Sequence, residues 1–266
     1  MSSIVTDQGI LHFEVIGRGR PLILLHGWIN SWDVWRNAML AVTGRGGYRL
    51  YALDFWGFGD SAKPAHDGGS AFRLSSYVEM VRGFMDNLGI SSAPLAGHSM
   101  GGTVALQFAL AYPERVSKVI VVGSPVYGRS LNPMLQLAGY GWSAWVAWRV
   151  PAIREGIMRA ILAGDSRPVR QMIFRDVQRT TLQSFFRSIG DLRDTDLRGK
   201  LQRLNQPALG IYGANDNIVS PKNGPILARE AGRARLAVMH QSRHFPMSDE
   251  PEKFVETLST FLLNGH

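Results

Sequence analysis

A serine stands between glycines in the run Gly97-His98-Ser99-Met100-Gly101. An apolar stretch typical of a buried strand precedes this run, and an apolar stretch typical of a helix follows it. The spacing fits the G-x-S-x-G nucleophile elbow, a sharp turn in which a side chain at either glycine would collide with neighbouring chain. Such a turn exposes the serine hydroxyl and puts the next backbone N–H at a helix N-terminus, where it can bind a developing oxyanion. The pattern predicts that Ser99 is a nucleophile.

A serine hydroxyl needs a base, and the base needs an acid that orients it. Among the seven histidines, His244 follows the last predicted strand in a loop that leads to the final helix, and His240 at the end of that strand is the alternative. Asp216 stands in a loop that leaves a strand, and the chain order Ser99, Asp216, His244 is the one that accompanies this type of elbow. Because residues 121–125 contain no carboxylate after the preceding strand, Asp216 is the predicted acid.

Two backbone N–H groups are predicted to form an oxyanion hole. Met100 offers the N–H that follows the nucleophile, and Trp28 offers one from the loop after the apolar run at 21–27. This prediction rests on position, because a backbone donor needs no particular side chain. Asp54 and Asp60 are interpreted as loop-building groups that bond backbone amides. The remaining histidines are interpreted as structural, solvent-exposed or terminal residues: His12, His26, His66, His98 and His266.

Short apolar runs alternate with helical patterns, which indicates repeated βα units around a parallel sheet. The strand-like runs are 10–17, 21–27, 48–54, 92–99, 116–124, 207–216 and 236–245, and the helical patterns between them are 31–40, 74–88, 100–113 and 251–263. Residues 125–205 hold helical patterns and turn signals but no convincing strand. We therefore predict one α/β domain, formed by residues 1–124 and 206–266 and interrupted by a helical insertion at 125–205.

Five motifs together resemble those of the α/β-hydrolase fold superfamily, and they occur in that superfamily's order. They are HGW (26–28), DFWGFGDS (54–61), GHSMGG (97–102), YGANDNIV (212–219) and SRHFPMSDEPEKF (242–254). The resemblance implies a mostly parallel eight-stranded sheet flanked by helices, with a helical cap inserted after strand six, where the alternation stops. It also implies a two-step acyl transfer that uses no metal or organic cofactor. Serine at position 99 disfavours the subfamilies with an aspartate nucleophile, such as haloalkane dehalogenases and epoxide hydrolases.

These features favour a serine hydrolase of the carboxylesterase or lipase-like type, which cleaves a small apolar carboxylic ester through an acyl-enzyme. Similar triads serve C–C bond hydrolases, lactonases, thioesterases, and cofactor-free perhydrolases or haloperoxidases, so these chemistries stay open. A further alternative is a ligand-binding member of the fold that keeps the triad with little turnover. An intact set of three residues argues against a complete loss of chemistry.

Three tryptophans in the predicted insertion, Trp142, Trp145 and Trp148, are spaced three residues apart, which places them near one face of a helix. They either seal the insertion against the core or form the wall of an apolar pocket or lipid-binding patch. In the second case Trp142 and Trp145 are candidate substrate-binding residues. Arginines lie beside them: Arg149, Arg154 and Arg159.

The net charge of +8 is concentrated in the same insertion. Residues 125–205 contain 13 Arg and Lys against 6 Asp and Glu, while the rest of the chain contains 16 against 15. This surplus indicates a solvated arginine-rich surface, an anionic ligand or an anionic membrane surface. No nucleic-acid-binding signature is present, so no such partner is predicted. With no cysteine, no signal peptide and no apolar run long enough to span a bilayer, the chain is predicted to be a cytoplasmic protein.

Overall fold

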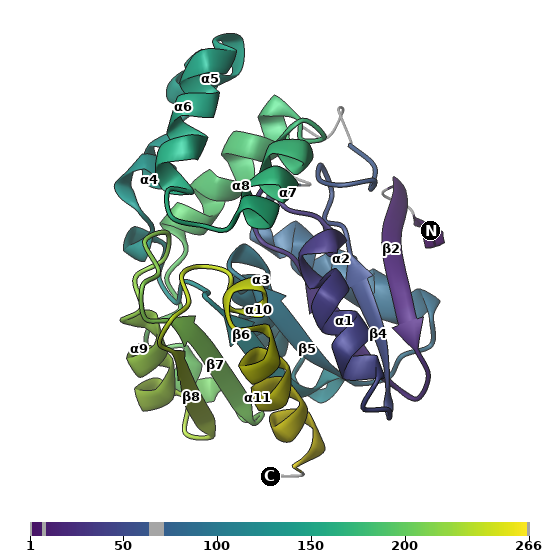
Figure 1. Cartoon of the computed structure of the whole chain (residues 1–266). Helices are drawn as coiled ribbons and strands as arrows, with labels where there is room; N and C mark the ends of the chain where they lie inside the picture. The colour runs from purple at the N-terminus through teal and green to yellow at the C-terminus, as the bar shows by residue number, and fades with distance from the viewer. Residues whose placement is uncertain (1, 7–8, 64–71, 265–266) are drawn as a thin grey trace.

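Eight strands form one sheet in the computed structural model, which describes residues 2–6, 9–63 and 72–264. The strand order is β1-β2-β4-β3-β5-β6-β7-β8 (Figure 1). The strands are β1 (Ser2–Thr6), β2 (Gly9–Gly17), β3 (Arg20–Leu25), β4 (Tyr48–Leu53), β5 (Ala93–His98), β6 (Val116–Val122), β7 (Ala208–Gly213) and β8 (Ala234–Met239). Two of the histidines discussed above, His66 and His266, lie outside the described residues.

Only β2 runs in the opposite direction to the other strands. Strand β2 pairs antiparallel with β1 and with β4, and every pair from β4 to β8 is parallel. The central strands carry continuous apolar runs, such as Leu22–Leu25 in β3, because helices cover both faces of a parallel sheet. The prediction of a mostly parallel eight-stranded sheet is confirmed.

Helices lie on both faces of the sheet. Helices α1 (Arg36–Thr43) and α11 (Pro251–Leu263) pack against each other, whereas α2 (Leu74–Asn87) packs against α3 (Met100–Ala111), which contacts β5 and β6 (Figure 1). Helix α9 (Asn223–Glu230) contacts β7 and β8. The short α10 (Pro246–Asp249) leads into α11. This arrangement brings the carboxyl ends of β3, β5, β7 and β8 to one edge of the sheet.

The chain between β6 and β7 forms five helices. They are α4 (Pro133–Ala138), α5 (Gly141–Arg149), α6 (Pro151–Ile161), α7 (Arg167–Val177) and α8 (Leu182–Asp194). Helix α8 contacts both α4 and α5, and Figure 1 shows α5 and α6 projecting away from the sheet. No named strand lies in this segment of the described chain, where isolated bridges at Tyr127 and Leu131 are the only β pairing. None of the helices that the structure describes is both long enough and apolar enough to cross a bilayer.

Three element predictions differ from the structure. The last strand does not reach residue 245, because it ends at Met239, which pairs with the last residue of β7, Gly213. Beyond Gly213 the two segments no longer pair as strands, although the N–H of Asn215 still donates to the carbonyl oxygen of Ser242 at 3.0 Å. The helical pattern at 31–40 is divided into a 3₁₀ turn (Trp32–Trp35) and α1. Strand β1 was not predicted, since none of its five residues is fully buried.

Candidate active site

The predicted nucleophile lies in the turn between a strand and a helix of the core. Ser99 follows β5 directly and precedes α3, with φ of 51° and ψ of −120°. This left-handed conformation is costly for a residue with a Cβ, and such strain is found mainly at functional sites. A Cβ on Gly97 would lie 2.2 Å from the backbone of Gly101, and one on Gly101 would lie 2.4 Å from the carbonyl oxygen of Leu25. Both glycines are therefore required for the turn to form.

The predicted base and acid are hydrogen-bonded to each other. His244 is 3% exposed in the turn after β8, and its Nδ1 lies 2.8 Å from Oδ2 of Asp216. Asp216 lies in the loop after β7, where its Oδ1 accepts the backbone N–H groups of Ile218 (2.8 Å) and Val219 (2.9 Å). An ionised carboxylate only accepts hydrogen bonds, so Nδ1 of His244 carries the proton and Nε2 keeps its lone pair. The alternative histidine, His240, is exposed.

Ser99 and His244 line the same small cavity, which we name the serine cavity, with a volume of about 40 Å³. Twelve of its fifteen lining residues are apolar, and the exceptions are Ser99, His244 and Asn30. No hydrogen bond joins Oγ of Ser99 to the His244 ring in the part of the chain that the structure describes. Such bonds are often long or misaligned before substrate binds, and the shared cavity brings the two side chains to one site.

His98 supports the backbone of the base. Its Nε2 lies 2.9 Å from the carbonyl oxygen of His244, and its side chain is fully buried. Burial, together with the neighbouring His244 ring, holds the pKa of His98 well below its usual value. The ring is therefore neutral, and it donates its Nε2–H to that carbonyl. No local pattern in the sequence indicates this contact, which joins residues far apart in the chain.

The two predicted oxyanion donors lie on either side of Ser99. Met100 is the first residue of α3, so its N–H has no acceptor within the helix. A Cβ on Gly27 would lie 3.1 Å from Cβ of Ser99, so the loop that carries Trp28 runs directly over the nucleophile. That loop is a turn in which Asn30 N–H donates to the Gly27 carbonyl at 3.2 Å.

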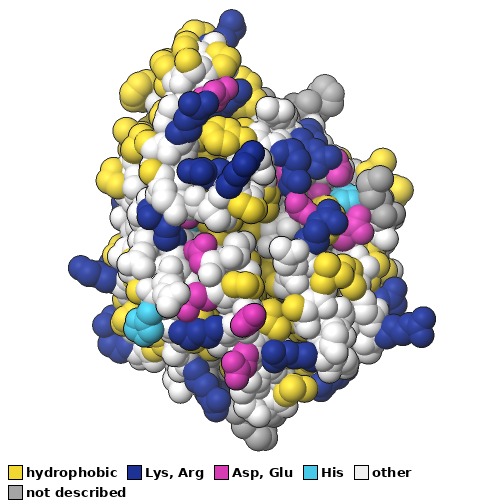
Figure 2. All heavy atoms as spheres, in the orientation of Figure 1, with side chains coloured by type: hydrophobic (Ala, Val, Ile, Leu, Met, Phe, Trp, Pro, Cys, Tyr) yellow, Lys and Arg dark blue, Asp and Glu magenta, His cyan; other side chains and the backbone are white. Residues whose placement is uncertain are grey.

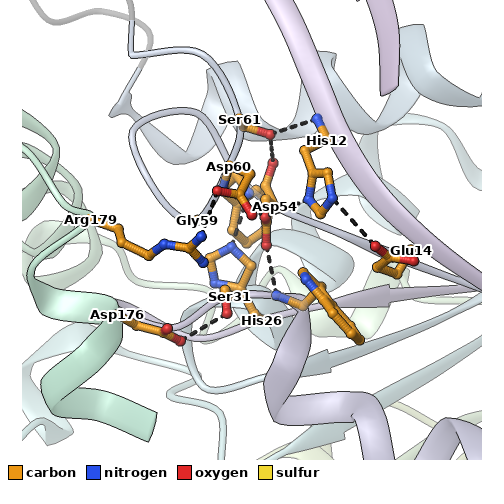
Figure 3. Close-up of polar contacts among 12 residues, drawn as sticks. His12, Glu14, His26, Ser31, Asp54, Gly59, Asp60, Ser61, Asp176 and Arg179 are labelled. Carbon is orange, nitrogen blue, oxygen red and sulfur yellow. Dashed lines mark hydrogen bonds and ion pairs between the residues drawn. The ribbon is translucent and has the colours of Figure 1, made fainter. Parts of the chain in front are cut away.

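A network of buried polar side chains bonds the chain on both sides of the loop that carries Trp28 (Figure 3). Asp54 is fully buried, and its Oδ1 accepts the backbone N–H of Trp32 at 2.7 Å, while its Oδ2 accepts that of Asp60 at 2.9 Å. Nε2 of His26 accepts the N–H of Phe55 at 2.9 Å. The interpretation of Asp54 as a loop-building residue agrees with these contacts. Asp60 differs, because its carboxylate pairs with Arg179 of the helical insertion at 2.8 Å.

His12, Asp54 and Asp60 lie close enough together to be considered as ligands for a metal ion. Each group already has a partner, however. Nδ1 of His12 bonds Oδ2 of Asp54 at 2.8 Å, and its Nε2 faces Glu14 at 3.6 Å (Figure 3). Burial is the largest single effect on the pKa of His12 and lowers it, but the hydrogen bond with Asp54 and the charges of Asp54, Asp60 and Glu14 together outweigh burial and raise this pKa. Because each of these groups already has a partner within the protein, we assign no metal ion to them.

The helical segment carries a second and larger cavity, which we name the cap cavity. Its volume is about 210 Å³, and fourteen of its sixteen lining residues are apolar. The two cavities are neighbours, because four residues line both of them: Trp28, Leu135, Met158 and Ile161. The side chains of these residues lie between the cap cavity and Ser99.

The three tryptophans have different positions. Trp142 lines the cap cavity and is 69% exposed, whereas Trp145 is 51% exposed and lines neither cavity. Trp148 is partly buried and packs on Phe185 at 5.7 Å between ring centroids. Trp148 is the one of the three that packs on another aromatic ring of the described chain, and because Phe185 belongs to α8 this contact lies within the insertion.

A contact between the insertion and the loop that carries His244 could not be predicted from the sequence. Asp165, which follows α6, is buried, and its Oδ1 lies 3.7 Å from Nε of Arg243, the residue before His244. The Arg243 guanidinium packs against Gly164, where a Cβ would lie 2.2 Å from it. Burial raises the pKa of Asp165 to about 6, against the opposing effects of Arg243 and His244.

Because this pKa is raised in the fold, ionisation of Asp165 opposes folding. The native state holds a proton that the unfolded chain loses near pH 4, so stability falls as pH rises from about 4 to about 6. We expect Asp165→Asn to remove this fall. The free energy of unfolding of the variant minus that of the wild type should increase by up to about 3 kcal/mol as the pH rises through that range. Urea unfolding of both proteins between pH 4.5 and 8 measures the difference. Asp194→Asn is the control, because Arg193 lowers the pKa of Asp194 and no such rise is expected. A difference independent of pH would contradict the assignment.

Comparison with known proteins agrees with this geometry. A family model described as alpha/beta hydrolase fold matches residues 20–158, which is just over half of the chain. The chain is 30% identical over 257 residues to a pimeloyl-[acyl-carrier protein] methyl ester esterase of Aeromonas hydrophila, covering 94% of this chain and 98% of the relative.

Solved structures show the same fold. An esterase from Exiguobacterium antarcticum superposes with a TM-score of 0.86 at 22% identity, covering 99% of each chain. An enol-lactonase from Burkholderia xenovorans superposes with a TM-score of 0.84 at 21% identity, covering 99% of this chain and 100% of that one. The family model and the esterase relative establish that this chain belongs to the alpha/beta hydrolase fold family.

Proposed function

We propose that this protein is a serine carboxylesterase that cleaves an apolar carboxylic ester, with Ser99 as nucleophile, His244 as base and Asp216 as orienting acid. The observation that carries the proposal is the His244–Asp216 hydrogen bond of 2.8 Å beside a strained serine on the same apolar cavity. The chemistry named for the Aeromonas relative, cleavage of a methyl ester, supports ester hydrolysis. The protein is accordingly a hydrolase of ester bonds.

The reaction proceeds in two steps. Nε2 of His244 takes the proton of Ser99 as Oγ attacks the ester carbonyl, and the N–H groups of Met100 and Trp28 bind the oxyanion. The intermediate collapses to an acyl-enzyme, and the leaving alcohol takes the proton from His244. A water molecule, deprotonated by the same nitrogen, then attacks the acyl carbon, and His244 returns this proton to Oγ of Ser99 as the bond from Oγ to the acyl group breaks and the acid is released. Asp216 keeps the proton of Nδ1 in place and stabilises the imidazolium that forms in each step.

The substrate is proposed to be apolar because the two cavities are. The serine cavity is small, so a chain longer than a few atoms must extend past Leu135 and Met158 into the cap cavity. Met158 is unbranched and flexible, which suits a side chain that moves when a ligand enters. We propose that residues 125–205 act as a cap domain over the core formed by 1–124 and 206–266. Cytoplasmic location stays a prediction from the composition.

Release of p-nitrophenol from esters of graded acyl length tests this function. We expect turnover with acyl chains of medium length to exceed turnover with acetate, since additional methylenes enter an apolar cavity. Peroxide-dependent halogenation, measured on the same preparation, separates an esterase from a haloperoxidase. An initial burst without steady turnover would instead indicate a binding protein, and halogenation faster than ester cleavage would contradict the proposal.

Filling the cap cavity should shift this chain-length preference. Ala144 lines the cap cavity but not the serine cavity, so Ala144→Leu shortens the space for the acyl chain without touching Ser99. We expect kcat/KM for medium-chain esters to fall roughly tenfold or more while acetate hydrolysis stays within about twofold. Retained acetate hydrolysis also shows that the variant is folded. Ala152→Leu, at an exposed position of α6, is the matched control and should leave both substrates unchanged. Equal losses for both esters would exclude the cap cavity as the site of the chain.

A further inference from the structure

Helices α4–α6 carry an unusual concentration of exposed apolar side chains. Eight of the fifteen exposed large hydrophobic residues in the described chain lie between positions 134 and 153. They are Met134, Leu137, Tyr140, Trp142, Trp145, Val146, Val150 and Ile153, which we name the tip patch. Figure 1 shows α5 and α6 projecting from the body of the molecule, and Figure 2 shows hydrophobic side chains covering this projection. An exposed apolar patch of this kind marks an interaction surface.

The residue types in the tip patch suit the boundary between water and lipid. Tyrosine and tryptophan have a large apolar ring with one polar group, and they gather at membrane interfaces for that reason. Trp142 is 69% exposed and Trp145 is 51% exposed, so both rings can enter a headgroup layer without any rearrangement of the fold. Arginines accompany them, since Arg149 stacks over Trp145 and Arg154 over Trp148, each at 5.1 Å.

The charge around the tip patch is positive. Helices α4–α6 contain Arg149, Arg154 and Arg159 but only one acidic residue, Glu155, which pairs with Arg159 at 3.5 Å. Figure 2 shows Lys and Arg side chains next to the hydrophobic ones on this projection. A basic surface with exposed apolar residues attracts anionic headgroups and then inserts its apolar side chains. The same charge opposes the pairing of this patch with its copy on a second molecule.

The tip patch and the cap cavity share their residues. Five of the eight exposed side chains also line the cap cavity: Met134, Leu137, Trp142, Val146 and Ile153. The wall of the cavity is therefore part of the surface that would touch lipid. A chain that passes from a bilayer into this cavity moves from one apolar environment to another and avoids exposure to water.

We propose that helices α4–α6 dock on an anionic lipid bilayer and that the cap cavity takes its ester substrate, by the apolar chain, from that surface. The proposal rests on the proposed esterase function for the identity of the substrate, but docking itself requires no turnover. Ser99→Ala should therefore bind vesicles as the wild type does while hydrolysing nothing. This variant separates a failure of docking from a failure of the esterase assignment.

Co-flotation of the full chain with vesicles tests the docking. We expect binding to phosphatidylcholine vesicles that contain about one third phosphatidylglycerol, weak binding to pure phosphatidylcholine, and loss of binding as salt is raised. The double variant Trp145→Asp/Val150→Asp alters exposed residues that line neither cavity, and it should bind about tenfold more weakly or worse. Arg149→Glu/Arg159→Glu should show a loss of similar size. All of these variants except Ser99→Ala should hydrolyse a soluble acetate ester at the wild-type rate, which shows that they are folded.

Leu40→Asp is the matched control, because Leu40 is an exposed hydrophobic residue (55%) on α1, away from the tip patch. It should bind vesicles as the wild type does. Equal binding of the Trp145→Asp/Val150→Asp variant, or no binding of the wild type to anionic vesicles, would overturn the proposal. Light scattering gives the oligomeric state. If the wild type were a dimer and the Trp145→Asp/Val150→Asp variant a monomer, the tip patch would be a self-association surface and the proposal would be overturned. Salt-sensitive binding to an acidic protein, with no binding to vesicles, would also overturn the proposal.

Discussion

Ser99→Ala should lower kcat/KM for a p-nitrophenyl ester by roughly 10⁴–10⁶-fold and leave the fold intact. Ser99 carries the only hydroxyl group among the residues that line the serine cavity, and the alanine variant keeps His244, the proposed oxyanion donors and the binding surface but no alcohol nucleophile. Residual catalysis above the rate in water should therefore persist. The fold should tolerate the change, because Oγ of Ser99 makes no hydrogen bond in the described structure and its loss leaves no buried group unpaired.

Labelling with a fluorophosphonate gives the second readout of this prediction. The reagent should modify Ser99 in the wild type, as peptide mass mapping would show, and should not modify the Ser99→Ala variant. Ser92→Ala is the matched control, since Ser92 is an exposed serine in the loop before β5 and should label and turn over normally. Equal labelling of the Ser99→Ala variant, or modification of another residue, would remove Ser99 from the mechanism.

Asp216→Asn should lower kcat/KM by roughly 10⁴-fold, although it changes only one atom of the side chain. Oδ1 of Asp216 accepts two backbone N–H groups, from Ile218 and Val219. An asparagine must keep its oxygen towards these two donors, so its NH₂ group points to Nδ1 of His244. Nδ1 then becomes an acceptor, and the ring proton moves to Nε2. A ring protonated at Nε2 cannot take the proton of Ser99.

The measurements for this variant are kinetics and labelling, together with thermal unfolding. We expect fluorophosphonate labelling of Ser99 to slow in parallel with turnover, while the melting temperature changes by only a few degrees. Asp86→Asn, which replaces a half-exposed carboxylate that pairs with Arg115, is the control and should leave activity unchanged. Activity of Asp216→Asn within about tenfold of wild type would show that Asp216 does not set the tautomer of His244.

The strands of the core could be predicted because each carries its own signal. Apolar runs that end in glycine or a polar residue identified β3–β7, and the elbow motif gave the position of Ser99 in the chain. Strand β1 has no such signal, since it is an edge strand whose residues alternate between partly buried and exposed. The end of β8 depends on where β7 stops pairing with it. The residue pattern at 236–245 contains no information on that point.

The cavities could not be predicted because their walls come from distant parts of the chain. The serine cavity joins Trp28 after β3, Leu192 of α8 and Phe245 beside the base. Helical spacing predicts one face for Trp142, Trp145 and Trp148, but their surroundings differ. Trp142 lines the cap cavity, Trp145 faces solvent and Trp148 packs on Phe185. Helical spacing shows which residues share a face, but not what packs against that face.

The sequence alone determined the chemistry available to this protein: a serine between glycines, with an aspartate and a histidine following in the order that this fold requires. These residues can be recognised without coordinates, because the strained turn demands glycines at fixed spacing around the serine, and the acid and the base are limited to few residue types in a known chain order. Only the tertiary structure determined which substrates can reach Ser99. The size of each cavity, the contact of Asp165 with the base loop and the exposure of the tip patch arise from packing between segments far apart in the chain, where many residue types fill space equally well.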